Sequence, residues 1–171
     1  PAAAKGAKDF ASLAATAPKG NRVVLINRPN SPQSFILGAQ RTDLDARDPA
    51  WVDFTNANNA LGGNFLARLN MNLRETKGWS YGVRGTISQL ENRAPYIVNA
   101  PVQANRTGES IAALISQYDR FLGAEGVTAA ERERTVLGDT RALSGSYETS
   151  FQVLGALRSN ALYGRPDNYQ E

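Results

Sequence analysis

The sequence predicts an α+β domain in which helices pack on one face of a mainly antiparallel sheet. Expected strands come in adjacent pairs, at residues 22–28 with 33–40 and at 80–88 with 95–103. Parallel sheets would instead alternate each strand with a helix. Hydrophobic residues make up 42% of the 171 residues, enough for one core. No apolar run approaches the roughly 18 residues of a membrane span.

Residues 1–21 are expected to form a linker or a frayed helix, and residues 22–171 a single domain. Alanine favours helix in the first segment, but no apolar face accompanies it. The run RVVLINR at 22–28 predicts the first strand, and Pro29 and Pro32 separate it from the second. The chain does not begin with Met, so we expect a processed product or an excised piece.

Two helices are expected between the strand pairs. Asp48 and Pro49 provide an N-cap and a first helical residue, and a glycine pair ends this helix. Asn64 is expected to cap the second helix, and Gly78 to end it in a left-handed conformation. The apolar face expected for the second helix comprises Phe65, Leu66, Leu69 and Leu73, with the three leucines in the core.

The second strand pair and three further helices complete the chain. The expected loop at 89–93 joins the strands, and alternate residues of the later strand share one side: Tyr96, Val98, Ala100 and Val102. Thr107 caps a helix that Gly123 ends, and Thr128 with Glu131 forms a capping box. Gly145 interrupts, and a final helix runs to about residue 163, before Gly164.

Several kinds of chemistry are excluded by residue types. The chain has no His and no Cys, so an ordinary zinc site and a His-based catalytic triad are impossible within it. Asp43, Asp45 and Asp48 lack the glycine and distal Glu of a calcium loop. The net charge of +3 is spread along the chain, which indicates a solvated surface rather than a nucleic-acid interface.

Arg74 and Tyr81 lie on either side of the expected helix-to-strand corner, seven residues apart. A guanidinium and a phenol at one corner can both donate hydrogen bonds to a carbonyl or an oxyanion. Residue types alone leave another interpretation open, in which Arg74 faces the helix C-terminus and Tyr81 packs in the core. Trp79 is expected to be a packing residue. Arg84 is expected on the strand face opposite Tyr81, without a catalytic role.

The run LGGNFLARLNMNLRETKGWSYGVRG at 61–85 resembles the C-terminal-half signature of the insulinase/pitrilysin family of zinc metallopeptidases, the inverted zincins. The flanking run NRPNSPQSFILGAQ and the helical tail from 128 to 166 also agree, so the likeness covers about residues 22–166. The positions that match the signature are Gly62-Gly63, Arg68-Leu69, Leu73-Arg74-Glu75, Lys77-Gly78 and Ser80-Tyr81.

The resemblance implies a division of labour between two homologous halves that close around an unfolded peptide. One half binds zinc through an H-x-x-E-H motif, and the other supplies an Arg/Tyr pair. By this resemblance Arg74 and Tyr81 are the assisting catalytic pair, and they bind substrate together with Gly62 and Gly63. This chain would hold no cofactor or metal, and zinc would lie in a partner half of the same polypeptide or of a second subunit.

The resemblance also implies that the chain alone is inactive and that it stops before the family domain's final helix and strand. The alternative function is a non-catalytic structural or assembly subunit of the same fold, and a basic nucleic-acid binder is a weaker third. An H-x-x-E-H motif in the parent gene or its neighbour would favour the peptidase. Likeness to bacterial family members predicts a periplasmic or membrane-associated location, with the cytoplasm as the alternative.

Overall fold

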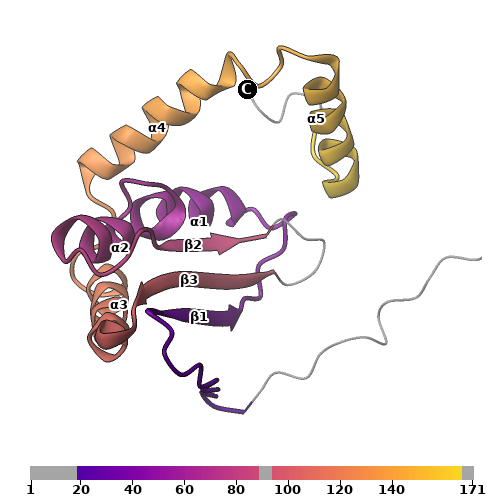
Figure 1. Cartoon of the computed structure of the whole chain (residues 1–171). Helices are drawn as coiled ribbons and strands as arrows, with labels where there is room; N and C mark the ends of the chain where they lie inside the picture. Colours follow the sequence, from indigo (N-terminus) through magenta and orange to yellow (C-terminus); the bar gives the residue numbers. More distant parts are fainter. Residues whose placement is uncertain (1–18, 89–93, 167–171) are drawn as a thin grey trace, which may run out of the picture.

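The computed structural model describes residues 19–88 and 94–166 and confirms the α+β class (Figure 1). Its three strands form an antiparallel sheet in the order β1-β3-β2, and helices cover one face. The expectations for residues 1–18 and for the loop at 89–93 lie outside the described residues. The elements are β1 (Gln33–Arg41), α1 (Trp51–Asn58), the π-helix η2 (Asn59–Gly63), α2 (Arg68–Asn70), the π-helix η3 (Met71–Thr76), β2 (Arg84–Ile87), β3 (Pro95–Gln103), the 3-10 helix η4 (Ala104–Arg106), α3 (Thr107–Leu122), α4 (Ala129–Leu143) and α5 (Ser150–Tyr163).

The hydrophobic core lies between the sheet and the helices. Central strand β3 contributes alternate residues to it, as its sequence predicts. The buried cluster comprises Leu61, Leu69, Leu73, Val83, Val98, Ala100, Val102 and Leu114. On the other face of the sheet Phe35 and Leu37 remain 66% and 63% exposed. They lie opposite Pro101 and Asn99 of β3, so these four residues share an open sheet face.

The strand predicted at residues 22–28 is not formed. Val23 and Leu25 are 91% and 90% exposed, and the segment has no strand assignment. A strand exists only where a neighbour accepts and donates its backbone hydrogen bonds. None of the described strands pairs with this segment, so it does not form a strand although its composition favours one.

The helix predicted to begin at Asn64 begins instead at Arg68. The Asn64 side-chain oxygen accepts a hydrogen bond from the Leu66 backbone N–H at 2.9 Å, which holds the chain in a turn. Phe65 and Leu66 consequently point away from the core and are 52% and 48% exposed. The prediction that Leu66 is a core residue is therefore wrong, whereas the predictions for Leu69 and Leu73 are confirmed.

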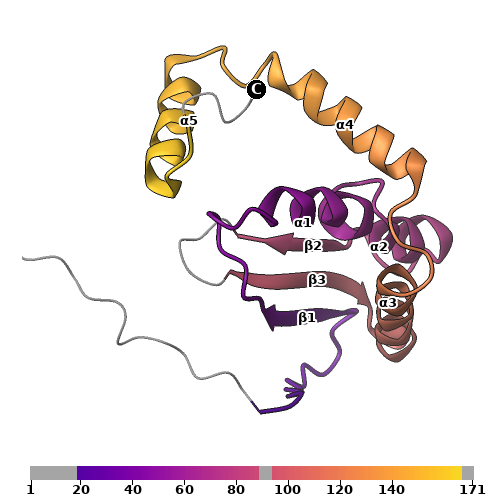
Figure 2. The same ribbon diagram turned by 180° about the vertical axis from the view of Figure 1, so that it is seen from behind.

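Helices α4 and α5 extend away from the sheet as an arm (Figure 2). The capping box of Thr128 and Glu131 starts α4, as predicted. Glu131 also accepts two hydrogen bonds from Arg68, both at 2.6 Å, which ties the start of α4 to α2. At the far end the Arg165 guanidinium donates to the Ala46 carbonyl at 2.7 Å, so the arm is anchored to the domain at both ends.

Candidate functional site

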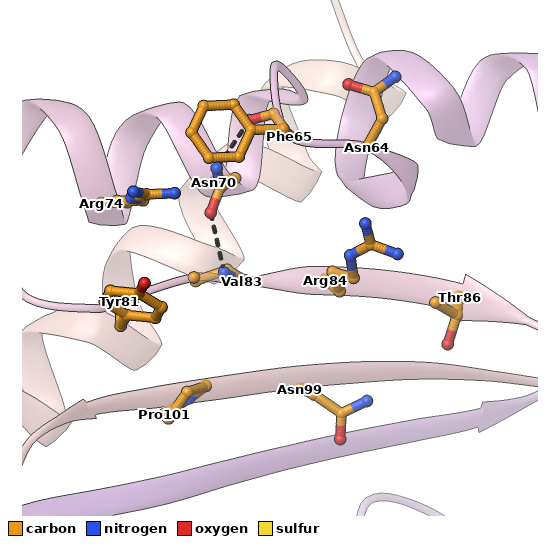
Figure 3. Close-up of a pocket in the computed structure, with 11 residues that line it drawn as sticks. Asn64, Phe65, Asn70, Arg74, Tyr81, Val83, Arg84, Thr86, Asn99 and Pro101 are labelled. Carbon is orange, nitrogen blue, oxygen red and sulfur yellow. Dashed lines mark hydrogen bonds between the residues drawn. The ribbon is translucent and has the colours of Figure 1, made fainter.

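A cavity of about 380 Å³ lies where η3, the turn before α2 and the open sheet face meet (Figure 3). The turn supplies Asn64 and Phe65, the helix supplies Arg74, and β3 supplies Asn99 and Pro101. The fourth wall is the segment from 81 to 86, which contains Tyr81 and Arg84. The structure therefore brings the predicted pair, Arg74 and Tyr81, into one cavity.

Arg74 lies in a π-helical turn, which aims its side chain at the cavity. The Lys77 N–H donates to the Asn72 carbonyl five residues back at 3.0 Å. Gly78 then ends the helix with a φ of 63°, a left-handed conformation that glycine adopts without strain, as predicted. Isolated π-helical turns occur frequently at functional sites because they redirect side chains that a regular helix would place elsewhere.

The Arg74 guanidinium is held by two aromatic rings and one carboxylate. Its central carbon lies 4.5 Å from the centroid of the Phe65 ring and 5.2 Å from that of Tyr81. Its Nε lies 3.2 Å from Glu75 Oε1. Guanidinium groups over aromatic faces are attracted by the ring quadrupole. These contacts orient the guanidinium group. Its two Nη nitrogens make no hydrogen bond within residues 19–88 and 94–166.

Tyr81 projects from a short irregular segment and is 84% exposed, so the alternative in which it packs in the core is wrong. Ser80 explains the projection, because its hydroxyl donates to the Pro101 carbonyl and accepts from the Gly82 N–H. The first bond ties Ser80 to β3, and the second ties Gly82 to Ser80. Its phenol has no hydrogen-bond partner among the described residues and is exposed to solvent.

Asn70 joins the two walls of the cavity and was not anticipated from the sequence. Its side-chain nitrogen donates to the Phe65 carbonyl at 2.7 Å, and its oxygen accepts from the Val83 N–H at 3.0 Å. The residue is 3% exposed. The sequence could have indicated this role, because Asn70 follows the core residue Leu69 in a predicted helix. A buried amide side chain needs buried hydrogen-bond partners.

Arg84 lines the same cavity as Tyr81, contrary to the expectation that it lies on the opposite strand face. That expectation assumed a regular strand from residue 80. In the structure β2 begins only at Arg84, so the alternation of faces does not extend back to Tyr81. Figure 3 shows Arg84 extending from β2 toward Asn64, whereas Arg74 and Tyr81 lie near the other end of the cavity.

Gly62 and Gly63 lie in η2, outside the residues that line the cavity. A Cβ atom on Gly62 would lie 2.8 Å from the backbone nitrogen of Gly85, so glycine permits the helix to approach β2. Their contact with substrate stays a prediction. Trp79 packs against the core, as expected for a packing residue, and the Lys77 Nζ lies 4.5 Å from its ring centroid.

The residue types around the cavity do not suit a metal ion. No group of three or more metal-ligating side chains occurs in the described ranges, and the whole chain lacks His and Cys. None of the helices described is both long and apolar enough to cross a membrane. The cavity instead offers hydrogen-bond donors at its surface, which suit carbonyl or anionic groups.

Comparison with known proteins gives the family and the fold of the chain. A family model described as the peptidase M16 inactive domain matches residues 6–137. No curated protein sequence matches the chain. A crystal structure of a peptidase M16 inactive domain from Pseudomonas fluorescens is similar, with 23% identity and a TM-score of 0.70. The similarity covers 90% of this chain and 41% of that one, so this chain spans less than half of its length.

Two further solved structures share the fold. The inactive peptidase domain of a proposed zinc protease from Bordetella parapertussis is 20% identical with a TM-score of 0.65, covering 83% of this chain and 76% of that one. The periplasmic protease PqqL from Escherichia coli is 19% identical with a TM-score of 0.63, covering 83% of this chain and 16% of that one.

Proposed function

The chain belongs to the family of peptidase M16 inactive domains, and we propose that it is the substrate-binding and transition-state-assisting half of a zinc-dependent endopeptidase. Its substrates would be unfolded peptides, and a partner half bearing H-x-x-E-H would complete the enzyme. The family assignment agrees with the insulinase/pitrilysin resemblance of the sequence. The geometry of Arg74 and Tyr81 supports the assisting role.

In this proposal Tyr81 donates its phenolic hydrogen to the oxyanion that develops on the scissile carbonyl. Donors placed where negative charge develops lower the barrier to peptide hydrolysis. Arg74 uses its two Nη groups to hold a neighbouring carbonyl of the extended peptide. The Phe65 and Tyr81 rings and the Glu75 carboxylate pre-orient the guanidinium, so little side-chain freedom is lost on binding.

The chain has no His or Cys, and residues 19–88 and 94–166 group no three metal-ligating side chains, so the metal belongs to the partner half in this proposal. Zinc there would supply an activated water for attack on the carbonyl. What this chain contributes is binding and hydrogen-bond donation. Gly62 contributes by letting η2 approach Gly85 of β2, whereas a Cβ atom on Gly63 would lie 2.8 Å from Asn59 Oδ1.

The single observation that carries the proposal is the exposure of Tyr81 beside Arg74 at a cavity, where a structural tyrosine would be buried. The test is peptide hydrolysis by the intact enzyme, comparing wild type with Tyr81→Phe and measuring zinc content in both. We expect kcat to fall by about a hundredfold with zinc unchanged. Tyr147→Phe, an exposed tyrosine outside the cavity lining, is the matched control. Unchanged kinetics for Tyr81→Phe would favour the structural-subunit alternative.

We also propose a periplasmic location. The support is the similarity to one periplasmic protease. Fractionation of cells that produce the full-length protein tests this, since recovery in the cytoplasmic fraction would contradict it.

A further inference from the structure

Arg84 brings a second guanidinium to the cavity that already contains Arg74. Its side chain is exposed and extends across the cavity toward Asn64 (Figure 3). In the part of the chain that the structure describes, no carboxylate lies within ion-pair distance of Arg84. The lining contains no acidic residue at all, so both charges of the cavity have the same sign.

The guanidinium groups of Arg74 and Arg84 differ in the contacts that they make. Arg74 is paired with Glu75 and contacts two aromatic rings, so its charge is partly compensated. Arg84 is bordered by the polar uncharged side chains of Asn64, Thr86 and Asn99. Like charges around one cavity raise the energy of each other, and an anion that enters relieves this repulsion.

We propose that this cavity binds a carboxylate of the peptide substrate and that Arg84 is the residue that selects it. The proposal rests on the function proposed above and adds the substrate class, a peptide that presents Asp, Glu or its C-terminal carboxylate near the scissile bond. A guanidinium matches a carboxylate with two parallel hydrogen bonds. Arg74 and Tyr81 would bind the main chain of the peptide substrate, while Arg84 binds its carboxylate.

The face on which Arg84 lies supports an extended ligand. Arg84 pairs with Asn99 of β3, and Leu37 of β1 pairs with the same residue. Leu37 and its neighbour on this face, Phe35, are both more than half exposed. The end of the cavity that contains Arg84 therefore continues into an apolar sheet surface. The peptide side chains that follow the carboxylate can lie on this surface.

The test uses the complete enzyme, this chain together with its catalytic half, and three peptides of equal length. The first has an internal Glu and an amidated C-terminus, the second has Gln in place of Glu, and the third has Gln with a free C-terminus. We expect wild type to cleave one or both carboxylate peptides with a kcat/KM about tenfold above that of the neutral peptide. Which of the two is favoured distinguishes a side chain from a terminus as the source.

Arg84→Gln should abolish the preference for the carboxylate peptide, mainly by raising the KM of that peptide. Arg84→Glu should instead prefer a fourth peptide, in which Lys replaces the internal Glu. Arg134→Gln on α4, which removes an equal charge outside the cavity lining, should keep the wild-type preference. An unchanged ratio of kcat/KM between the preferred carboxylate peptide and the neutral peptide in Arg84→Gln would overturn the proposal. Inhibition by a single-stranded oligonucleotide that requires Arg84 would overturn it as well. Tyr81→Phe separates the two proposals, because it lowers kcat for all three peptides without altering their ratio.

Discussion

The Arg74 guanidinium carbon lies 4.5 Å from the centroid of the Phe65 ring. Arg74 belongs to η3, whereas Phe65 belongs to the loop that precedes α2. Phe65 reaches this position because the Asn64 turn holds it outside the following helix. Its ring is half exposed, lies outside the buried core cluster, and lines the cavity beside Arg74. In the function proposed above, Phe65 acts on substrate through the direction that its ring gives to Arg74.

Phe65→Leu should lower kcat/KM of the intact enzyme by about twofold to fivefold, since a cation–π contact at a partly exposed site contributes about 0.5–1 kcal/mol. The free energy of unfolding should change little, because the side chain is 52% exposed. Steady-state kinetics and urea unfolding measure the two quantities. Leu66→Ala, at an adjacent and similarly exposed position, is the control. Equal loss of activity in both variants would contradict the role of the ring.

This position also shows what the sequence could not predict. Phe65, Leu66, Leu69 and Leu73 have helical spacing, which predicted one apolar face. The Asn64 side chain competes with the helix by bonding the backbone two residues on, and spacing alone does not reveal which interaction is favoured. The later part of the same pattern was predicted correctly, because Leu69 and Leu73 lie beyond the reach of that turn.

Gly62→Ala should destabilise the domain by about 1–3 kcal/mol, because the added methyl group would press against buried backbone. The new Cβ would lie 2.8 Å from Gly85 N and 3.1 Å from Leu69 Cδ1. Urea unfolding monitored by circular dichroism measures the change. Gly138→Ala in α4 is the matched control, since no atom lies within 4 Å of its added Cβ. This control should be stabilised by about 0.5–1 kcal/mol from helix propensity. A neutral Gly62→Ala would mean that η2 can move away from β2.

Glu131 should make the stability of the domain sensitive to acid. Hydrogen bonds from Arg68 lower its pKa to about 2 in the folded chain, from an ordinary value of 4.5. A lowered folded pKa gives stability that is present above the unfolded pKa and is lost as the pH falls from about 5 toward 2. Glu131→Gln should therefore lower the free energy of unfolding by about 2 kcal/mol at pH 7 and by much less at pH 3.

Urea unfolding at the two pH values measures this difference. Glu133→Gln, at an exposed position of the same helix, should have little effect at either pH. An effect of Glu131→Gln that is equal at pH 3 and pH 7 would show that the carboxylate charge is not the source of the stabilisation.

The purified chain should show no peptidase activity, with or without added zinc. It has no His or Cys, and the structure groups no three metal-ligating side chains within the described residues. Cleavage of a fluorogenic peptide and zinc binding by equilibrium dialysis provide the measurements, and the intact enzyme is the positive control. Zinc-dependent cleavage that copurifies with the chain and disappears in Tyr81→Phe would contradict the division into two halves.

The sheet shows a second limit of sequence reasoning. The alternation of Val98, Ala100 and Val102 predicted β3 correctly, because a central strand is paired on both sides and its faces are decided by burial. Residues 22–28 have equally suitable composition, but pairing depends on a neighbour and not on the strand alone. Arg84 was assigned to the wrong face for a related reason. Ser80 pairs with Val102 and Arg84 with Asn99, so four residue steps on one strand oppose three on β3 and the alternation of faces is broken between them.

The π-helical turn of η3 makes the aim of Arg74 depend on chain length as well as on residue type. Each residue of an α-helix turns the following side chain by about 100°. The Lys77 N–H bonds Asn72, five residues back, so η3 contains one residue more than a regular turn would hold. Deletion of one residue between Met71 and Leu73 would turn Arg74 by about 100° relative to the preceding chain and move it away from Phe65. Relatives that have one residue fewer between Leu69 and Arg74 would thus lose the contact between Arg74 and Phe65 while keeping both residues.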